Sequence, residues 1–264
     1  LHKEYRRQRQ MCIRDSNTFN AGVWYEYGNF ETGRYFSQAP LLGQGTLGNP
    51  TNGFPADKIF ATAWHEAFSS NTFVFHMQDT YHVTDTLKIN AGFKSMIVNA
   101  GNSVLAQDET INGKPIAQGH LEASNAFLPQ ISANWRFLPH HELFFDVSHN
   151  MRAFPEDGFG TNISASPWTA SQASFQETKK TLRPETDWVY EGGYRFSSQY
   201  ISALASLYRI NFSNRLQLIT NSAGINPVTA VQNVGGVTTN GAEASITVRP
   251  MHGLSIYNSF SYAH

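Results

Sequence analysis

Apolar and polar residues alternate along most of the chain, and the alternation is clearest between residues 182 and 212. There the first arm of a predicted hairpin sends aromatic side chains to one face: Trp188, Tyr190, Tyr194 and Phe196. Its other face carries Asp187, Glu191 and Arg195. Because successive side chains of a strand point to opposite sides, this pattern predicts a β-strand with an apolar medium on one side and water on the other.

The same alternation predicts about nine strands from residue 17 onward, joined alternately by short turns and long polar connections. The short turns lie at residues 84–86, 139–141, 197–199 and 250–253. The long connections lie at residues 30–58, 99–125, 152–181 and 219–230. All short turns therefore fall at one end of the strands and all long loops at the other. This asymmetry is typical of a transmembrane barrel, whereas a soluble sandwich or propeller does not require it.

Composition favours the same interpretation. Charged residues make up 15% of the chain, well below the roughly 25% of an ordinary soluble domain. No apolar run approaches the ~18 residues that a membrane-spanning helix needs. Strands of a membrane barrel would not form such a run, because their apolar and polar residues alternate. The polar face is rich in Asn, Gln, Ser, Thr and Gly, which suits a wet or plugged lumen.

Aromatic residues near strand ends on the apolar face predict the girdles that mark the two membrane interfaces. These predicted lipid-interface residues are Trp135, Phe137, Trp188, Phe196 and Tyr262. Asp79 disagrees with a lipid-facing surface, because it lies on the apolar face between Met77 and Tyr81. A charge is tolerated there only near an interface, where its cost falls to about 0–1 kcal/mol.

Residues 1–16, LHKEYRRQRQMCIRDS, are basic and show no strand alternation. The string MCIRDS resembles the translation of a transposase adapter from a DNA sequencing library. We therefore predict that residues 1–16 are adapter-derived and outside the fold, with residues 17–264 forming the barrel portion; a short basic tail is the alternative. Without Cys12, the only cysteine, no disulfide or thiolate site can form, and the chain has no basic stripe for nucleic acid.

Three strings resemble the β-barrel of TonB-dependent outer-membrane receptors: QDTYHVTDTLKINAGFKS (78–95), LRPETDWVYEGGYRF (182–196) and NVGGVTTNGAEASITVRP (233–250). The phrases L-x-P-E-x-x-x-x-Y-E-x-G-Y-R and N-V-G-x-x-x-x-x-G-x-E are specific when they occur together in this order. The resemblance covers most of residues 17–264, although the long loops contribute little to it.

This resemblance implies an all-β, antiparallel up-and-down barrel of 22 strands with a plugged lumen, in the bacterial outer membrane. It also implies uptake of a scarce nutrient, such as a ferric siderophore, with energy from the inner-membrane TonB complex. The expected partners are outer-membrane lipid, a small-molecule ligand such as a metal chelate and, through a region before residue 17, TonB. With about nine strands, the chain is expected to be a fragment without plug or closing strands, which forms an open, curved sheet.

No residue pattern predicts an enzyme, a cofactor or a metal site. The ten histidines lack metal-ligand spacing, and the pairs Glu156/Asp157 and Glu185/Asp187 lack a nucleophile or oriented base. Aromatic and cationic residues in the long loops could instead bind an anionic or aromatic ligand. These substrate-contact candidates are Arg34, Tyr35, Phe159, Trp168 and Phe175, with ordinary loop packing as the alternative for each.

The alternation leaves two other functions open. One is a passive porin-like channel, which would lack the plug, and the other is a soluble all-β binding protein. If the barrel is incomplete, its two unpaired strand edges predict that the isolated chain aggregates or misfolds.

Overall fold

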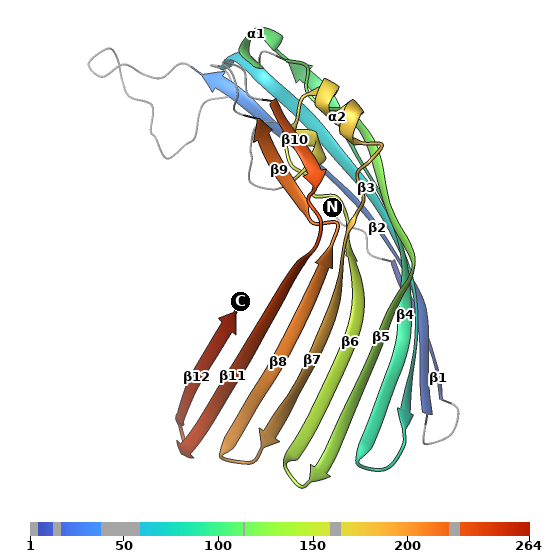
Figure 1. The fold of residues 1–264 in the computed structure, drawn as a ribbon, viewed down its shortest axis with the longest axis vertical. Coiled ribbons are helices and arrows are strands. Elements are labelled where there is room, and N and C mark those ends of the chain that lie inside the picture. The colour runs from blue at the N-terminus through green and yellow to red at the C-terminus, as the bar shows by residue number, and fades with distance from the viewer. Residues whose placement is uncertain (1–4, 13–16, 38–58, 113, 159–164, 222–227) are drawn as a thin grey trace, which may run out of the picture.

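The structure is a computed structural model that describes residues 5–12, 17–37, 59–112, 114–158, 165–221 and 228–264. Its main feature is an open, curved antiparallel sheet (Figure 1). Within the described residues the sheet has ten strands, in the order β1-β2-β3-β4-β5-β6-β7-β8-β11-β12. They are β1 (Tyr5–Cys12), β2 (Asn17–Ser37), β3 (Ile59–His82), β4 (Leu87–Gln107), β5 (Gly119–Leu138), β6 (His141–Arg152), β7 (Glu185–Ser197), β8 (Ile201–Ser213), β11 (Val237–Met251) and β12 (Leu254–Ala263).

A separate two-stranded sheet pairs β9 (Leu216–Asn221) with β10 (Val228–Asn233). These strands continue the β8–β11 hairpin beyond a break at residues 214–215 and 234–236. The short helices are α1 (Glu109–Asn112), η3 (Pro167–Thr169) and α2 (Gln172–Thr178). No helix among the described residues is long and apolar enough to cross a membrane.

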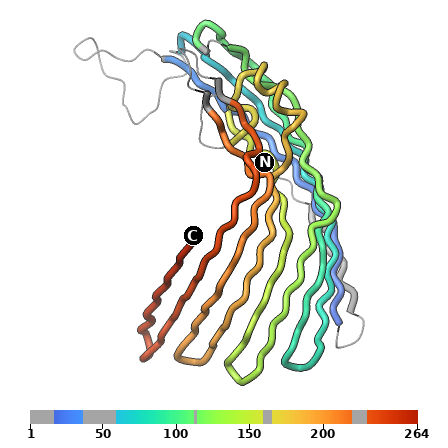
Figure 2. The backbone as a smooth tube through the Cα atoms, in the orientation of Figure 1, coloured from blue at the N-terminus to red at the C-terminus, as the bar shows by residue number. Residues whose placement is uncertain are grey.

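From residue 17 onward the main sheet confirms the predicted strands and fold class. Its nine strands there are those that the alternation predicts, each paired with its neighbours in an antiparallel ladder. The four short turns lie together at the bottom of Figure 1, and the backbone tube shows the tight reversals there (Figure 2). We call this side the turn end of the sheet and the opposite side the loop end.

At the loop end the strands run further than predicted. β2 continues to Ser37, β4 to Gln107, and β5 already begins at Gly119. The predicted connections 30–58 and 99–125 are therefore wrong at their bounds, and residues 219–230 contain parts of β9 and β10. The reason is that strands beyond the membrane need no apolar outer face, so the alternation fades while the backbone ladder continues.

Residues 5–12 form β1, which pairs with β2 from Tyr5–Tyr25 to Cys12–Thr18. This strand differs from the prediction that residues 1–16 stand outside the fold. A sheet edge offers unpaired N–H and C=O groups that any extended segment can satisfy, whatever its side chains. The structure does not test the origin of the DNA that encodes residues 1–16, so their adapter origin stays a prediction.

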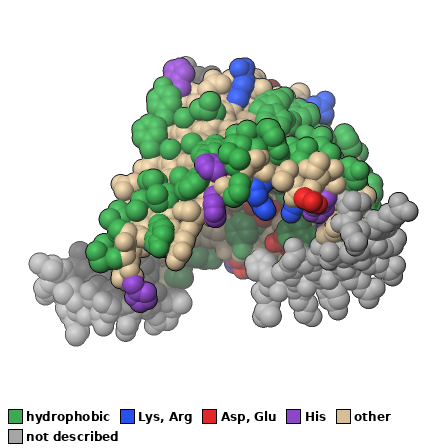
Figure 3. Space-filling model, turned by 90° about the horizontal axis from the view of Figure 1, so that it is seen from below, with side chains coloured by type: hydrophobic (Ala, Val, Ile, Leu, Met, Phe, Trp, Pro, Cys, Tyr) green, Lys and Arg blue, Asp and Glu red, His purple; other side chains and the backbone are tan. Residues whose placement is uncertain are grey.

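The two faces of the sheet differ in chemistry. Cross-strand register places Leu143 beside Tyr194 on one face and Glu142 beside Arg195 on the other. Seen from the turn end, the sheet is an arch with hydrophobic side chains over its convex side, and the acidic side chains in view lie toward the hollow (Figure 3). We call the convex side the outer face and the concave side the inner wall.

The buried core lies at the loop end, where residues 153–158 and 165–184 pack between β3–β5 and the β9–β10 hairpin. We call this cluster the loop-end core. Its buried members are Phe68, Val98, Ala100, Ala117, Leu121, Ala123, Leu128, Met151, Phe154, Trp168, Phe175, Leu182, Leu216 and Val231. Apolar groups from strands far apart in the chain are thus removed from water together, as in a soluble domain.

Candidate functional site on the inner wall

The inner wall carries charges of both signs on separate strands. His76 on β3 lies opposite Lys94 on β4, which makes that part of the wall basic. On β6 and β7, Asp146 lies opposite Glu191. Like charges directly opposite each other in a sheet are destabilising. Within the described part of the chain no cation bonds to either carboxylate, so this pair favours a basic neighbour from outside the sheet.

Another carboxylate of the wall, Glu142, is neutralised by Arg195. Nη1 of Arg195 donates to Oε1 of Glu142 at 2.9 Å and to Oδ1 of Asn134 at 3.3 Å. The guanidinium also lies 3.9 Å from the ring centre of Phe144, a cation–π contact. Gly193 makes room for this ring, because a Cβ there would lie 2.6 Å from it. The glycine and arginine of the YEGGYRF phrase therefore form one packing unit.

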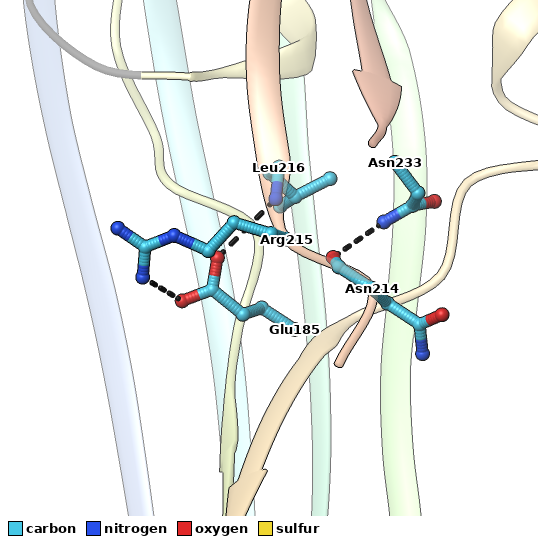
Figure 4. Close-up of polar contacts among 5 residues, drawn as sticks. All are labelled: Glu185, Asn214, Arg215, Leu216 and Asn233. Atoms are coloured by element: carbon cyan, nitrogen blue, oxygen red, sulfur yellow. Dashed lines mark hydrogen bonds and ion pairs between the residues drawn. The ribbon is translucent and has the colours of Figure 1, made fainter. Parts of the chain in front are cut away.

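Glu185 of the LRPET phrase bonds to the residues at the break between β8 and β9 (Figure 4). Glu185 is only 4% exposed. Its carboxylate accepts hydrogen bonds from Nη1 of Arg215 at 3.0 Å and from the backbone N–H of Leu216 at 3.2 Å. The guanidinium of Arg215 also stacks 4.6 Å from the ring centre of Phe212. Glu185 thus fixes the first residues of β9 to the start of β7.

The NVGG phrase completes this contact from the other strand. Asn233 donates from Nδ2 to the carbonyl oxygens of Asn214 at 2.7 Å and of Arg183 at 2.9 Å. Its Oδ1 accepts the backbone N–H of Arg183 at 2.8 Å. Asn214 has φ 55, a left-handed conformation that an asparagine tolerates better than most residues. We call the Glu185 and Asn233 contacts the strand-break clamp.

Trp168 is the central side chain of the loop-end core. Ser166 caps η3 by accepting the N–H of Trp168 at 3.4 Å, and the indole Nε1 donates to the carbonyl oxygen of Gly119 at 3.0 Å. The indole ring meets Phe68 edge-on, with 5.9 Å between ring centres, and lies 6.1 Å from Phe175. Its polar atom is satisfied and its ring is fully packed, so Trp168 holds the connection against the inner wall.

A buried polar pair supports the same connection. Glu66 on β3 and Asn102 on β4 are 0% and 2% exposed, and Nδ2 of Asn102 donates to Glu66 and to the carbonyl oxygen of Ala117. Gly158 packs against the carboxylate, because a Cβ there would lie 3.2 Å from Oε2 of Glu66. Sequence reasoning missed this pair. The available signal was a carboxylate on the face of β3 that also carries Trp64, between two large apolar positions.

Arg34 and Tyr35, two of the predicted substrate-contact residues, lie on β2 and not in a loop. Arg34 is exposed, with its guanidinium 5.8 Å from the ring centre of Phe36. Tyr35 is 44% exposed and lies beside His65, with 5.9 Å between ring centres. Among the described residues no carboxylate pairs with Arg34, and the aromatic ring beside its guanidinium is that of Phe36, not Tyr35.

The other three candidates do not join them. Trp168 and Phe175 are both 0% exposed, so neither presents a surface to a ligand in this conformation. Their burial follows from packing between distant strands, which a single loop sequence does not reveal. Phe159 lies outside the described residues. Among the described candidates the structure brings together Trp168 and Phe175 inside the core, whereas Arg34 and Tyr35 are sequence neighbours that contact different residues.

The predicted lipid-interface aromatics lie on the outer face with half-buried or exposed rings: Trp135, Phe137, Trp188, Phe196 and Tyr262. At the turn end, Trp135 and Phe137 lie 5.6 Å apart, and Phe196 packs 4.9 Å from His141. Trp188 lies further toward the loop end, stacked on His149 with 4.6 Å between ring centres. Their contact with lipid stays a prediction.

Two carboxyl groups in the connections have shifted pKa values. Burial raises the pKa of Glu156, and a hydrogen bond from Ser70 acts weakly against this. Hydrogen bonds from the side chain and backbone of Thr110 lower the pKa of Asp108, which precedes α1. No group of three or more potential metal ligands occurs in the ranges that the structure describes.

An apolar convex face, a polar concave wall, tight turns at one end and long folded connections at the other define the wall of an outer-membrane β-barrel. The sequence matches the family described as TonB dependent receptor-like, beta-barrel, over residues 4–264. The chain therefore belongs to the TonB-dependent receptor family, as the sequence phrases predicted. This membership places it in the bacterial outer membrane and in a class of receptors, not enzymes.

Solved structures share the fold at low identity. The copper transporter OprC has a TM-score of 0.61 and 15% identity, over 99% of this chain and 37% of OprC. The FrpB iron transporter of Neisseria meningitidis has a TM-score of 0.61 and 12% identity, over 99% of this chain and 36% of FrpB. The ferric citrate transporter FecA has a TM-score of 0.61 and 18% identity, over 99% of this chain and 34% of FecA. The chain thus spans about a third of each, and no curated protein matches its sequence.

Proposed function

We propose that this chain forms part of the barrel of a receptor that imports a scarce nutrient, such as a ferric siderophore or another metal chelate, with energy from the inner-membrane TonB complex. The observation that carries the proposal is the family match over residues 4–264. Similar folds described as transporters of copper, iron and ferric citrate support a metal-containing cargo.

Arg34 and Tyr35 are the residues that we propose for ligand contact. An exposed guanidinium that pairs with no carboxylate among the described residues, and an exposed phenol, are each groups that can bind an anionic ligand with aromatic or carboxylate groups, as many metal chelates have. Phe159 stays a candidate in the same connection as the core. For Trp168 and Phe175 we propose a supporting role, in which they keep the connection folded against the wall.

The lumen is proposed to hold a plug domain that precedes the barrel strands and reaches TonB. The Asp146–Glu191 pair supports a plug domain with basic side chains on its surface, because two opposed carboxylates are stabilised by a cation between them. The choice of active import over a passive pore rests on the family match, not on this pair.

Uptake of a radiolabelled ferric chelate by cells tests the proposal. Cells with the intact receptor should accumulate iron, and deletion of either the receptor or TonB should abolish accumulation from dilute chelate. Arg34→Gln should raise the concentration needed for half-maximal uptake. Uptake that persists without TonB and rises linearly with chelate concentration would instead identify a passive channel.

A further inference from the structure

Arg209 is a cation on the face of the sheet that meets lipid. Its cross-strand neighbours are Tyr190 on β7 and Asn240 on β11. Tyr190 belongs to the aromatic row of the outer face, and paired residues of a sheet point to the same side. Arg209 is itself exposed. Its guanidinium therefore lies on the outer face of the barrel.

No carboxylate within the described residues pairs with this guanidinium. The row that contains Arg209 runs Val147, Tyr190, Arg209 and Asn240, and the next row toward the loop end runs His149, Trp188, Asn211 and Thr238. Neither row holds an acid. A positive charge on an apolar surface is costly without a counter-charge. The balancing charge must therefore come from outside the sheet.

The side chain extends toward the loop end. Nε of Arg209 donates to Oδ1 of Asn211 at 3.0 Å, and Asn211 lies two residues further along β8 in that direction. Long cationic side chains that reach from apolar surface to a polar layer behave in this way. The reach indicates that the polar layer near Arg209 is the one at the loop end.

The position along the strand agrees. Arg209 lies six residues beyond Ala203, which pairs with the turn-end aromatic Phe196, and that separation is ~20 Å along a strand. The two rows between them are apolar and include Leu207 and Ala205. Arg209 therefore lies at the far edge of the apolar band, where an arginine on the lipid face costs least.

Arg209 and Asn211 lie beside aromatic side chains and keep hydrogen-bond donors that no described residue uses. Oδ1 of Asn211 accepts a hydrogen bond from Nε of Arg209 and another, at 3.2 Å, from the hydroxyl of Thr238. The terminal nitrogens of Arg209 and Nδ2 of Asn211 then have no partner among the described residues. Beside them Trp188 stacks between His149 and Tyr190, with ring centres 4.6 and 6.3 Å away. Such aromatic groups favour the membrane interface.

We propose that Arg209, Asn211, Trp188 and Tyr190 bind the phosphate-bearing head group of an outer-leaflet lipid. Arginine presents two parallel N–H groups that match two phosphate oxygens. The apolar rows below would contact the acyl chains of the same molecule. This site lies on the opposite side of the wall from the transported ligand, and it rests on placement in the outer membrane, not on transport.

Native mass spectrometry of the complete receptor that contains this chain tests the proposal. The probes are diphosphorylated lipid A and the same lipid after phosphate removal. The wild-type receptor should bind the phosphorylated form at least about ten-fold more tightly. Arg209→Gln should remove this preference, and Arg209→Lys should keep part of it. Lys94→Gln removes a positive charge from the inner wall and should leave the preference unchanged.

Three results would overturn the site. They are equal binding of the two lipids by the wild-type receptor, an unchanged preference in Arg209→Gln, and displacement of the lipid by excess inorganic phosphate. The last would indicate a site for free phosphate. If Arg209→Gln fails to fold, the comparison of the two lipids on the wild-type receptor still decides.

Discussion

The membrane part and the loop end of this sheet place their apolar side chains in opposite ways. In the membrane part the outer face leaves them uncovered by protein, with Phe145 at 49% and Leu207 at 70% exposure. At the loop end, Phe68 and Trp168 are at 1% and 0%. The first arrangement is stable only against lipid, and the second is stable in water.

β3 passes through both parts and shows where the change occurs. Phe73 points outward and is 48% exposed, whereas Phe68 points to the inner wall and lies in the loop-end core. The same strand therefore buries apolar groups on opposite faces at its two ends. The comparison teaches that the alternation of a strand identifies its faces, but the surrounding medium decides which face is covered by protein.

Trp168→Ala should produce the largest effect. Removing a fully packed indole from a core costs about 3–5 kcal/mol, and the loss should fall on the loop end alone. Hydrogen exchange of residues 165–182 would measure it. Trp188→Ala, on the outer face, is the matched control and should leave exchange in this segment unchanged. Equal acceleration by both variants would contradict the separation of the two parts.

Phe145→Arg should destabilise the membrane part next most strongly. Phe145 pairs with Ala133 and Gly192 on the outer face, and an arginine on the lipid face near mid-bilayer costs about 2–4 kcal/mol. Denaturant unfolding from lipid bilayers would measure the free energy. Ser132→Arg adds the same charge on the inner wall, opposite Asp146, and should cost little. A smaller cost for Phe145→Arg than for Ser132→Arg would reverse the assignment of the faces.

The strands and short turns could be predicted because they repeat a period-two pattern. The outer aromatics, such as Trp135 and Trp188, follow directly from it. The long-loop bounds could not be predicted, because β4 beyond Val98 reads NAGNSVLAQ, with small polar residues on both faces. Backbone pairing with β3 continues there without a side-chain signature.

The site was predicted less well because its parts meet only in three dimensions. Trp168 reads as a loop aromatic, and only the approach of β3, β5 and β10 buries it. The phrases that identify the family also had no physical meaning in sequence alone. In the structure, Gly241 lies against the ring of Tyr208, where a Cβ would clash, and Glu185 and Asn233 form the strand-break clamp.

Glu185→Gln tests whether this clamp couples the two parts. Glutamine keeps an acceptor for the Leu216 N–H but loses the ion pair with Arg215, whose side chain is 41% exposed. We expect a loss of about 1 kcal/mol, since solvent screens the arginine. Glu185→Ala removes both bonds and should cost about 1–3 kcal/mol. Hydrogen exchange at Leu216 would measure both, and no change in either variant would mean that the clamp does not hold β9.

Glu156→Gln should give the smallest effect, and one that depends on pH. Burial raises the pKa of Glu156 above its ordinary value of 4.5. The folded connection therefore favours the protonated carboxyl, and its stability falls as pH rises through the raised pKa. The variant should resist proteolysis of this connection better than wild type at neutral pH and equally well below pH 4.5.

Asp108→Asn is the control, because its effect on stability should change with pH in the opposite direction. Hydrogen bonds from Thr110 lower the pKa of Asp108 from its ordinary value of 3.8, so wild type gains stability above that pH and loses it as pH falls through the lowered pKa. The variant should therefore be the less stable protein at neutral pH. A pH profile with the same sign for both variants would contradict the roles given to the two carboxyl groups.

The five tryptophans of the chain test the central claim, that the outer face meets lipid while the loop end is covered by protein. Trp135 and Trp188 lie on the outer face, Trp64 and Trp168 are buried at the loop end, and Trp24 lies on the inner wall. Variants of the receptor that each retain one of these tryptophans would be folded into bilayers of brominated lipid. Strong quenching of Trp135 and Trp188, with little quenching of the other three, is the predicted result. Strong quenching of Trp168 or Trp24, or none of Trp135, would contradict the account.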